Sequence, residues 1–584
     1  MKTIRTALCT LALAAGPAVL PAQAPHPPAP SPFGERVDVN IVNVEAWVTD
    51  KDGKPVNGLQ RGDFEIREDG KPLPVVNFEA FTKQEPTPAA PGREAGKAAA
   101  APESMHLAIY VDNTFLLPAH RNRVLQQLRD FLGRLSPQDE VMLVTEDPGL
   151  KVRQAFTRDH AALLRTMDEI ETSGALGVSH ASAKAQAIDT ILNIREVNWK
   201  YDPCPPDLVQ PARSYADQLR ADVLRSLGAM TVLVSSLSGV PGRKAMLLVS
   251  DGMPVTPGEE IFQTLVEMCN PSGTSAFGEA IQGGPASGGH YDASQASLDA
   301  QSYDTSSAFR AFTGHANAQR VTVYTLEASG LAGASSAAAD IGPRERVLQL
   351  PGIQQVETSN LQNSLFVLAS DTGGHAILNA NDLTRDLTHI QEDFATYYSL
   401  AYSPLHSGDG RDHRIEVRVK RPGMKVRSRQ SYRDKPALER TVDRTLASLL
   451  YGYEDNPLEI QVETGDAAPL ALSSGKSASW SVPIRLRIPL FRVTMLPTET
   501  SFEGKLRLLV ATANADGKRS PVRQVQVPIH IPRLSALTAL GQYYQYEVKL
   551  TLETGEQHVA IAVRDEATAT TSFIARTLTL RGDP

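Results

Sequence analysis

Four runs of almost uninterrupted apolar residues recur through the middle of this chain, and they limit its fold more than any other feature. The runs cover residues 106–111, 140–145, 245–250 and 320–325. A strand that is apolar at nearly every position has both of its faces covered, as happens in a parallel sheet between two layers of helices. We therefore expect these four runs to be central strands of such a sheet.

The segments between these runs have the spacing of helices with one buried face. Over residues 120–135, apolar side chains return every three or four positions, at Val124, Leu128, Phe131 and Leu135. Further helices are expected over 159–170, 181–199, 213–237, 361–371 and 381–395, with shorter strands over 150–156 and 375–378. Strands that alternate with helices predict an α/β domain built on a doubly wound parallel sheet.

This α/β domain is expected to span residues 105–395 and to contain three insertions. They cover residues 200–212, 271–301 and 328–350. The second and third are rich in small residues, so we expect them to form mobile loops.

All-β modules are expected on both sides of the α/β domain. Residues 37–82 alternate in the manner of strands and contain Asp-Gly turn dipeptides, which are typical of β-hairpins. Residues 83–104 are rich in Pro and Ala and predict a flexible linker. On the other side we expect a β segment over 396–433, a connecting helix over 437–455 and a β-sandwich over 456–584.

The first 24 residues have the organisation of an export signal. A short basic segment precedes an apolar stretch, and residues 22–24 form the small-x-small cleavage site Ala-Gln-Ala. The apolar stretch is too short to span a bilayer comfortably and is interrupted by Pro17, so an uncleaved anchor is the less favoured interpretation. We therefore expect a mature protein that is periplasmic or secreted and has no transmembrane segment.

Cleavage near Ala24 leaves Cys204 and Cys269 as the only cysteines. Two thiols in an oxidising compartment often pair, so we favour a disulfide between two loops over two unrelated buried thiols. A catalytic cysteine is the least favoured interpretation, because nothing in the sequence marks a partnered base.

The overall charge argues against one class of partner. Lys and Arg number 58 against 66 Asp and Glu, which gives a net charge of −8. A nucleic-acid-binding protein normally carries a basic face. A basic cluster does occur on the strands expected near residue 420, and we interpret it first as a solvated face and second as a contact for an anionic surface. Its members are Arg414, Arg418, Lys420, Arg421, Lys425, Arg427 and Arg429.

Two acidic residues directly follow two of the apolar runs. Asp112 follows the run at 106–111, and Asp251 follows the run at 245–250. In a doubly wound sheet, ligands bind in the crevice beyond the carboxyl ends of the strands. Two carboxylates with nearby hydroxyls and water would make an oxygen-rich site for Mg²⁺. The alternative is that both residues simply cap the N-termini of helices.

At this point the sequence resembles a von Willebrand factor type A domain, and more closely the exported family related to it that is described from acidobacteria. The resemblance covers roughly residues 37–433. It is carried by the order and spacing of four features: the segment Gly-Asp-Phe-Glu-Ile-Arg-Glu-Asp-Gly-Lys-Pro over 62–72, the strand that ends in Asp112, Pro-Gly-Arg-Lys over 241–244 before Asp251, and Tyr397-Tyr398 before Tyr402.

The resemblance implies a metal-ion-dependent adhesion site with the pattern Asp-x-Ser-x-Ser, a distant Thr and a distant Asp. Asp112 matches the first Asp, Thr114 keeps the first hydroxyl, and Asp251 matches the distant Asp. Leu116 occupies the second Ser position and cannot ligate a metal. The counterparts expected for the distant Thr are Thr172, Ser173 and Ser179.

The function implied is that of an exported, non-enzymatic interaction protein. It would bind an unidentified protein partner, through an acidic side chain, at a divergent Mg²⁺ site made by Asp112, Thr114 and Asp251. Two alternatives stay open: a metal-dependent hydrolase that uses the same crevice, and a structural envelope protein with a vestigial site. The sequence contains no recognisable pair of nucleophile and base, which speaks against the hydrolase.

Overall fold

A computed structural model of the chain describes residues 41–81, 105–147, 149–198, 202, 204–269, 291–331, 351–470, 479–515, 518–535, 538–539 and 541–581. The expected export signal at 1–24 and the expected linker at 83–104 lie outside these residues. Most of the loops expected at 271–301 and 328–350 lie outside them as well.

A six-stranded sheet forms the centre of the α/β domain. Its strands are β5 (Met105–Val111), β6 (Glu140–Glu146), β7 (Leu150–Thr157), β8 (Arg243–Ser250), β9 (Val321–Glu327) and β10 (Ala376–Ile377), and their order in space is β10-β9-β8-β5-β6-β7. All neighbours are parallel except β7, which runs antiparallel to β6 at one edge. The α/β fold class is thus confirmed, with an edge strand that makes the sheet mixed.

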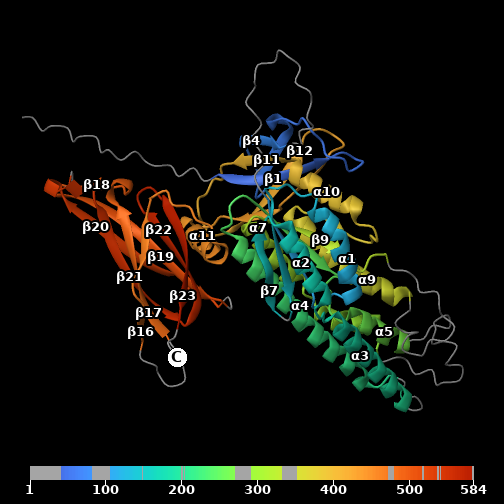
Figure 1. Cartoon of the computed structure of the whole chain (residues 1–584). Coiled ribbons are helices and arrows are strands. Elements are labelled where there is room, and N and C mark those ends of the chain that lie inside the picture. The colour runs from blue at the N-terminus through green and yellow to red at the C-terminus, as the bar shows by residue number, and fades with distance from the viewer. Residues whose placement is uncertain are drawn as a thin grey trace, which may run out of the picture. The chain divides into compact units, whose positions relative to one another are not determined.

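Helices cover both faces of this sheet because successive side chains of each strand point to opposite faces. On β5, Leu107, Ile109 and Val111 pack on one side, and Ala108 and Tyr110 pack on the other. The helices on the first side are α1 (Pro118–Leu132), α2 (His160–Thr172) and α10 (Thr384–Ala395), and those on the second are α3 (Gly177–Asn198), α4 (Gln210–Leu237), α5 (Glu259–Cys269), α6 (Ala293–Gln301), α7 (Ser306–Ala318) and α9 (Pro351–Thr372) (Figure 1). The four apolar runs are therefore buried on both faces, as their composition predicts.

Several helices were missed in the expected insertions. A short 3-10 turn, η2 (Pro206–Val209), and the start of α4 occupy part of 200–212, and α6 lies inside the loop expected over 271–301. Helices α5 and α7 were not predicted either. In α6 the residues buried against the core are Ala296 and Ala300, and such small residues give no apolar periodicity that a sequence can reveal.

One β domain is assembled from two distant segments of the chain. The first segment supplies β1 (Val42–Thr49), β2 (Phe64–Glu68), β3 (Lys71–Leu73) and β4 (Val75–Phe81), and the second supplies β11 (Tyr397–Tyr402), β12 (Asp412–Val419), β13 (Lys425–Ser428) and β14 (Ser431–Arg433). The two sheets, β13-β1-β11-β4 and β14-β12-β2-β3, each mix strands from both segments. The module expected over 37–82 and the segment expected over 396–433 therefore form a single unit, which we call the split β domain.

A second β unit follows α11 (Ala437–Tyr451). Its strands are β15 (Gln461–Thr464), β16 (Ala468–Pro469), β17 (Ser479–Pro489), β18 (Leu496–Pro497), β19 (Ser501–Asn514), β20 (Arg523–Pro532), β21 (Tyr543–Glu553), β22 (Gly555–Asp565) and β23 (Thr571–Leu580). They pair antiparallel in two sheets around a shared apolar core, as expected for a β-sandwich. Among the described residues, no helix is both long and apolar enough to cross a membrane.

Candidate functional site at the carboxyl ends of the central strands

Asp112 and Asp251 lie at the ends of β5 and β8, which are neighbours at the centre of the sheet. The strand order reverses between these two strands, which makes this point the topological switch where ligands bind in open α/β sheets. The backbone N–H of Asp112 donates to the carbonyl of Val249 at 3.0 Å, and the hydroxyl of Ser250 donates to Asp112 Oδ2 at 2.7 Å. The two acidic residues predicted from separate parts of the sequence therefore meet at one rim.

Asp112 is fully buried, and both of its carboxylate oxygens have donors. Oδ1 accepts from the backbone N–H of Phe115 at 3.2 Å, and Oδ2 accepts from Ser250. Burial, followed by the nearby charge of Glu146, raises the pKa of Asp112 to about 8. A carboxyl group in such surroundings holds its proton at neutral pH, and a nearby cation would favour its ionised form instead.

Among the described residues, Asp251 is bound through one of its two carboxylate oxygens. Oδ2 accepts from the backbone N–H of Leu117 at 3.1 Å and faces His120 Nδ1 at 2.8 Å. This hydrogen bond raises the pKa of the His120 imidazole. Oδ1 of Asp251 is buried, and in the described part of the chain it has no hydrogen-bond partner. The helix-capping role considered from the sequence thus explains the hydrogen bonds of Asp251 Oδ2, but it gives no role to Oδ1.

Thr114 and Leu116 follow Asp112 in the loop that leads to α1. Thr114 is buried, two residues beyond Asp112 in the segment that follows β5. Leu116 is completely buried and packs in the apolar core beside Val111 and Val124. The residue that breaks the adhesion-site pattern has therefore become part of the hydrophobic core.

Of the three hydroxyl residues expected to supply the distant Thr, two make hydrogen bonds to the backbone of α2. Thr172 donates to the carbonyl of Glu169 at 2.9 Å, and Ser173 donates to the carbonyl of Ile170 at 2.8 Å. Ser179 is exposed on α3. Two of these hydroxyls thus donate to carbonyl groups of α2.

Arg121 is the residue beside the crevice that the sequence analysis missed. Its side chain is completely buried in α1 and donates to the carbonyls of Glu171 and Ser173 at 3.0 and 2.9 Å, and to Asn113 Oδ1 at 3.1 Å. Asn113 in turn donates to Asp147 Oδ1 at 2.5 Å. Arg121 therefore fixes the loop after β5 against the loop after α2. No local sequence signal distinguishes it from a surface arginine of α1.

Mg²⁺ is the cation implied by the resemblance, and the donor atoms here fit it in kind. Asp112, Thr114 and Asp251 offer only oxygen, which hard cations prefer. The partnerless Oδ1 of Asp251 is an atom that a bound cation would satisfy. Water would have to help complete the coordination, since Leu116 is buried in the apolar core and the hydroxyls of Thr172 and Ser173 donate to carbonyls of α2.

The two described cysteines form a disulfide. Cys204 and Cys269 are joined, with their Cα atoms 5.6 Å apart. The bond connects the segment before η2 to the last residue of α5. The structure thus assigns both thiols to a covalent link between two elements, and neither is available as a nucleophile.

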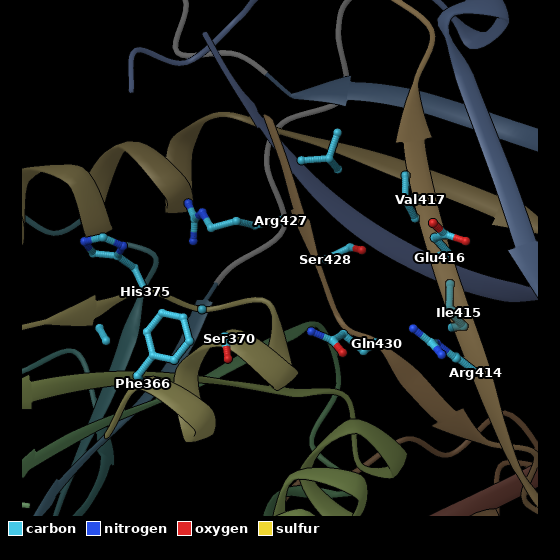
Figure 2. Close-up of a pocket in the computed structure, with 13 residues that line it drawn as sticks. Phe366, Ser370, His375, Arg414, Ile415, Glu416, Val417, Arg427, Ser428 and Gln430 are labelled. Carbon is cyan, nitrogen blue, oxygen red and sulfur yellow. The ribbon is translucent and has the colours of Figure 1, made fainter. Parts of the chain in front are cut away.

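A separate cavity of about 530 Å³ lies between the α/β domain and the split β domain. Figure 2 shows Phe366 and Ser370 of α9 on one side of it and Arg414 and Glu416 of β12 on the other. Neither Asp112 nor Asp251 lines it. The cavity is therefore distinct from the crevice.

The basic cluster near this cavity is only partly a solvated face. Arg427 binds both carboxylate oxygens of Asp393 at 2.7 Å, and Arg429 is buried, with its guanidinium donating to the carbonyl of Asn317 at 3.2 Å. Arg414 and Arg418 are exposed, as expected. Arg427 and Arg429 are thus structural. Alternation along a strand could not reveal this, because their partners come from other segments of the chain.

Comparison of the sequence with protein-family models and with curated proteins found no match. Among solved structures, the chain is similar to a von Willebrand factor type A protein from Catenulispora acidiphila, with 10% identity, a TM-score of 0.19 and coverage of 89% of this chain and 74% of that one. It is also similar to three N-terminal domains of a type V pili tip protein from Porphyromonas gingivalis, with 9% identity, a TM-score of 0.23 and coverage of 87% and 78%. A third is BatB from Bacteroides thetaiotaomicron, with 10% identity, a TM-score of 0.21 and coverage of 50% and 97%. Scores this low do not bear on function, and the fold assignment rests on the chain's own strand order.

Proposed function

We propose that this chain is an exported, non-enzymatic interaction protein that binds a protein partner at the crevice formed by Asp112, Thr114 and Asp251. A divalent cation, Mg²⁺ in the first instance, would sit between Asp112 and Asp251 and would accept an acidic side chain of the partner. The observation that carries the proposal is the buried, partnerless Oδ1 of Asp251 beside the buried Asp112, at the switch point of the sheet. The export signal pattern at 1–24 and the resemblance to the von Willebrand factor type A family support the same role.

Electrostatics supports a cation rather than a neutral ligand at this place. Asp112, Glu146 and Asp251 lie close enough for their charges to raise the pKa of Asp112. Glu146 already has two donors, the hydroxyls of Tyr110 at 2.6 Å and Ser226 at 2.8 Å. A divalent ion would remove the repulsion between these carboxylates, and a coordination position left free on the ion would accept a carboxylate of the partner.

The test is the response of the purified mature protein to Mg²⁺. A ligand that binds only the native state at one hundred times its Kd stabilises that state by about 2.7 kcal/mol. We expect Mg²⁺ to raise the Tm of the wild type and of Asp130→Asn, an exposed residue of α1. We expect no such rise in Asp251→Asn, which keeps the acceptor for Leu117 and His120. An equal rise in Asp251→Asn would contradict the proposal.

Partner binding and the hydrolase alternative are tested with the same variants. Proteins captured from the exported fraction of the producing cells should remain bound with Mg²⁺, and should be lost with chelator and from Asp251→Asn. A screen of peptide, ester and glycoside substrates separates the hydrolase. Turnover that disappears in Asp251→Asn would replace the interaction role with an enzymatic one.

A further inference from the structure

A second group of metal-ligating side chains lies in the split β domain, on elements that take no part in the crevice. His406 and Asp409 belong to the loop between β11 and β12, and Asp434 directly follows β14. Each of the three offers one ligand atom, and these atoms all lie within 4.8 Å of one another. Glu68, at the end of β2, forms an overlapping group with His406 and His413.

His406 is held between two carboxylates, one on each ring nitrogen. Its Nδ1 faces Asp434 Oδ2 at 2.8 Å, and its Nε2 faces Glu68 Oε2 at 3.3 Å. Glu68 is itself fixed, because its Oε1 accepts from the hydroxyls of Tyr402 at 2.9 Å and Tyr432 at 2.8 Å. A metal-bound histidine usually has its second nitrogen on a carboxylate in this way. The arrangement leaves Nδ1 as the nitrogen for an ion and Nε2 as the nitrogen that orients the ring.

The two histidines are stacked, and this decides which group can share an ion. The rings of His406 and His413 lie 3.8 Å apart, centroid to centroid, at an interplanar angle of 13°. The lone pair of an imidazole nitrogen lies in the plane of its ring, so two parallel, stacked rings cannot both direct a lone pair at one ion. The group of His406, Asp409 and Asp434 is therefore favoured over the group that contains both histidines.

His413 holds one of the proposed ligands in place. Its Nδ1 faces Asp69 Oδ2 at 2.8 Å and its Nε2 faces Asp409 Oδ2 at 3.2 Å. Asp69 is fixed because it also accepts from the backbone N–H of Arg414 at 2.9 Å. His413 thus ties Asp409 to the turn after β2 and acts as a positioning residue.

The loop that carries His406 and Asp409 is folded around Asp434. The backbone N–H of Gly408 donates to Asp434 Oδ2 at 2.6 Å, and the N–H of Gly410 donates to the Asp434 carbonyl at 2.8 Å. Both glycines have positive φ, at +62° and +73°, which other residues rarely adopt. The Asp434 side chain is 2% exposed and that of Asp409 is 29% exposed. The group is therefore buried at its base and open to water at Asp409.

We propose that His406, Asp409 and Asp434 bind one divalent transition-metal ion of the Zn²⁺ type, with Glu68 and His413 as positioning residues. One imidazole nitrogen and two carboxylates suit such an ion, and water completes its coordination at the open side. The ion takes the place of the proton on Nδ1 of His406. Mg²⁺ prefers oxygen ligands throughout, so this site differs in chemistry from the crevice, and it stands whether or not the crevice binds a cation.

The test uses the mature protein freed of metal and titrated with Zn²⁺ by calorimetry. We expect one saturable site, a loss of at least 100-fold in affinity in His406→Ala, and a loss of about 10-fold to 100-fold in His413→Ala. His389→Ala is the matched control, because His389 on α10 pairs with Glu392 at 3.1 Å and takes no part in the group around His406. The affinity of this variant should equal that of the wild type. If His406→Ala fails to fold, Asp409→Asn takes its place in the titration, because it changes a partly exposed ligand.

X-ray absorption at the zinc edge gives the second readout. We expect a first shell of one imidazole nitrogen with oxygens and no sulfur. Unchanged affinity in both His406→Ala and Asp409→Asn would overturn the proposal. A lack of saturable Zn²⁺ binding would also overturn it, if nitrogen NMR shows that both His406 nitrogens are protonated at neutral pH. The cluster would then be a hydrogen-bonded network without a metal ion.

Discussion

Asp112 and Asp251 are the same residue type at equivalent strand ends, and their neighbours give them different properties. Asp112 has donors on both oxygens and a pKa raised to about 8 by burial and Glu146. Asp251 has two partners on Oδ2, Leu117 and His120, and none on its buried Oδ1 among the described residues. The sequence places both residues at the crevice. The groups that distinguish them come from the segment after β5, from α1, from β6 and from β8, and the folded chain brings these together.

Lys244 gives a prediction about pH that involves neither proposed metal site. Its buried ammonium donates to the carbonyls of Ser238 and Val240, both at 3.3 Å. Burial, and next the charge of Arg320, lowers the pKa of Lys244 to about 7. The unfolded chain therefore binds one proton more than the native state between pH 7 and about 10.5, so the free energy of unfolding rises with pH over that range.

Lys244→Met should remove this part of the pH dependence, because methionine carries no titratable group. Urea unfolding at pH 7, 8.5 and 10, with chelator present, measures the slope. Lys151→Met, which changes an exposed lysine of β7, should keep the slope of the wild type. An identical slope in Lys244→Met would show that its ammonium stays charged in the native state.

At the scale of elements, the loop after β5 and the start of α3 fit closely together. The backbone N–H of Leu176 donates to the carbonyl of Asn113 at 2.6 Å. A Cβ added to Gly177 would lie 2.3 Å from the carbonyl oxygen of Leu116, which is far inside van der Waals contact. The position of the crevice loop therefore depends on the absence of a side chain at residue 177.

Gly177→Ala should lower the free energy of unfolding by about 1–3 kcal/mol, as other overpacked sites do, and should weaken the response to Mg²⁺. Gly228→Ala is the matched control inside α4, where a Cβ would meet nothing within 4 Å. That change should raise stability by about 0.5–1 kcal/mol, because alanine favours a helix more than glycine does. Chemical denaturation of both variants measures the difference, and equal stabilities would refute the tight fit.

The disulfide between Cys204 and Cys269 closes a loop across a sequence separation of 65. Such a link restricts the unfolded chain, and removing it typically costs about 2–4 kcal/mol. The double variant Cys204→Ser, Cys269→Ser should be destabilised by that amount in denaturant. The reduced wild type should match it, and full stability in the double variant would mean that the bond contributes only to local order.

At the scale of the whole molecule, the split β domain connects the beginning and the middle of the described chain. Val44 on β1 lies opposite Leu400 on β11, and Ile66 on β2 lies opposite Val417 on β12. These pairs join strands more than 300 residues apart, with the α/β domain inserted between them. Trp47 adds a link to that domain, since its indole N–H donates to the carbonyl of Asp393 at 2.9 Å.

This arrangement predicts that the chain can be cut between Phe81 and Met105 without coming apart. A specific protease site inserted there should give two fragments that elute together in size exclusion, because two sheets and a shared core hold them. They should separate only in denaturant. Separation in plain buffer would mean that the first four strands form an independent module, as the sequence had suggested.

Local chemistry in the sequence was enough to determine the α/β class, the central strands and helices such as α1, because apolar periodicity reports directly which faces are buried. It also placed Asp112 and Asp251 at strand ends. That Leu116 stands where the adhesion-site pattern needs a hydroxyl came from the family resemblance instead. Small-residue helices such as α6 carry no such pattern and stayed hidden.

Only the tertiary structure decided how distant segments combine. The union of residues 41–81 with residues 397–433 in shared sheets, the free oxygen of Asp251, and the meeting of His406, Asp409 and Asp434 all depend on contacts across long stretches of chain. Such contacts are fixed by packing and hydrogen bonding in the folded state, and no period or spacing along the sequence encodes them.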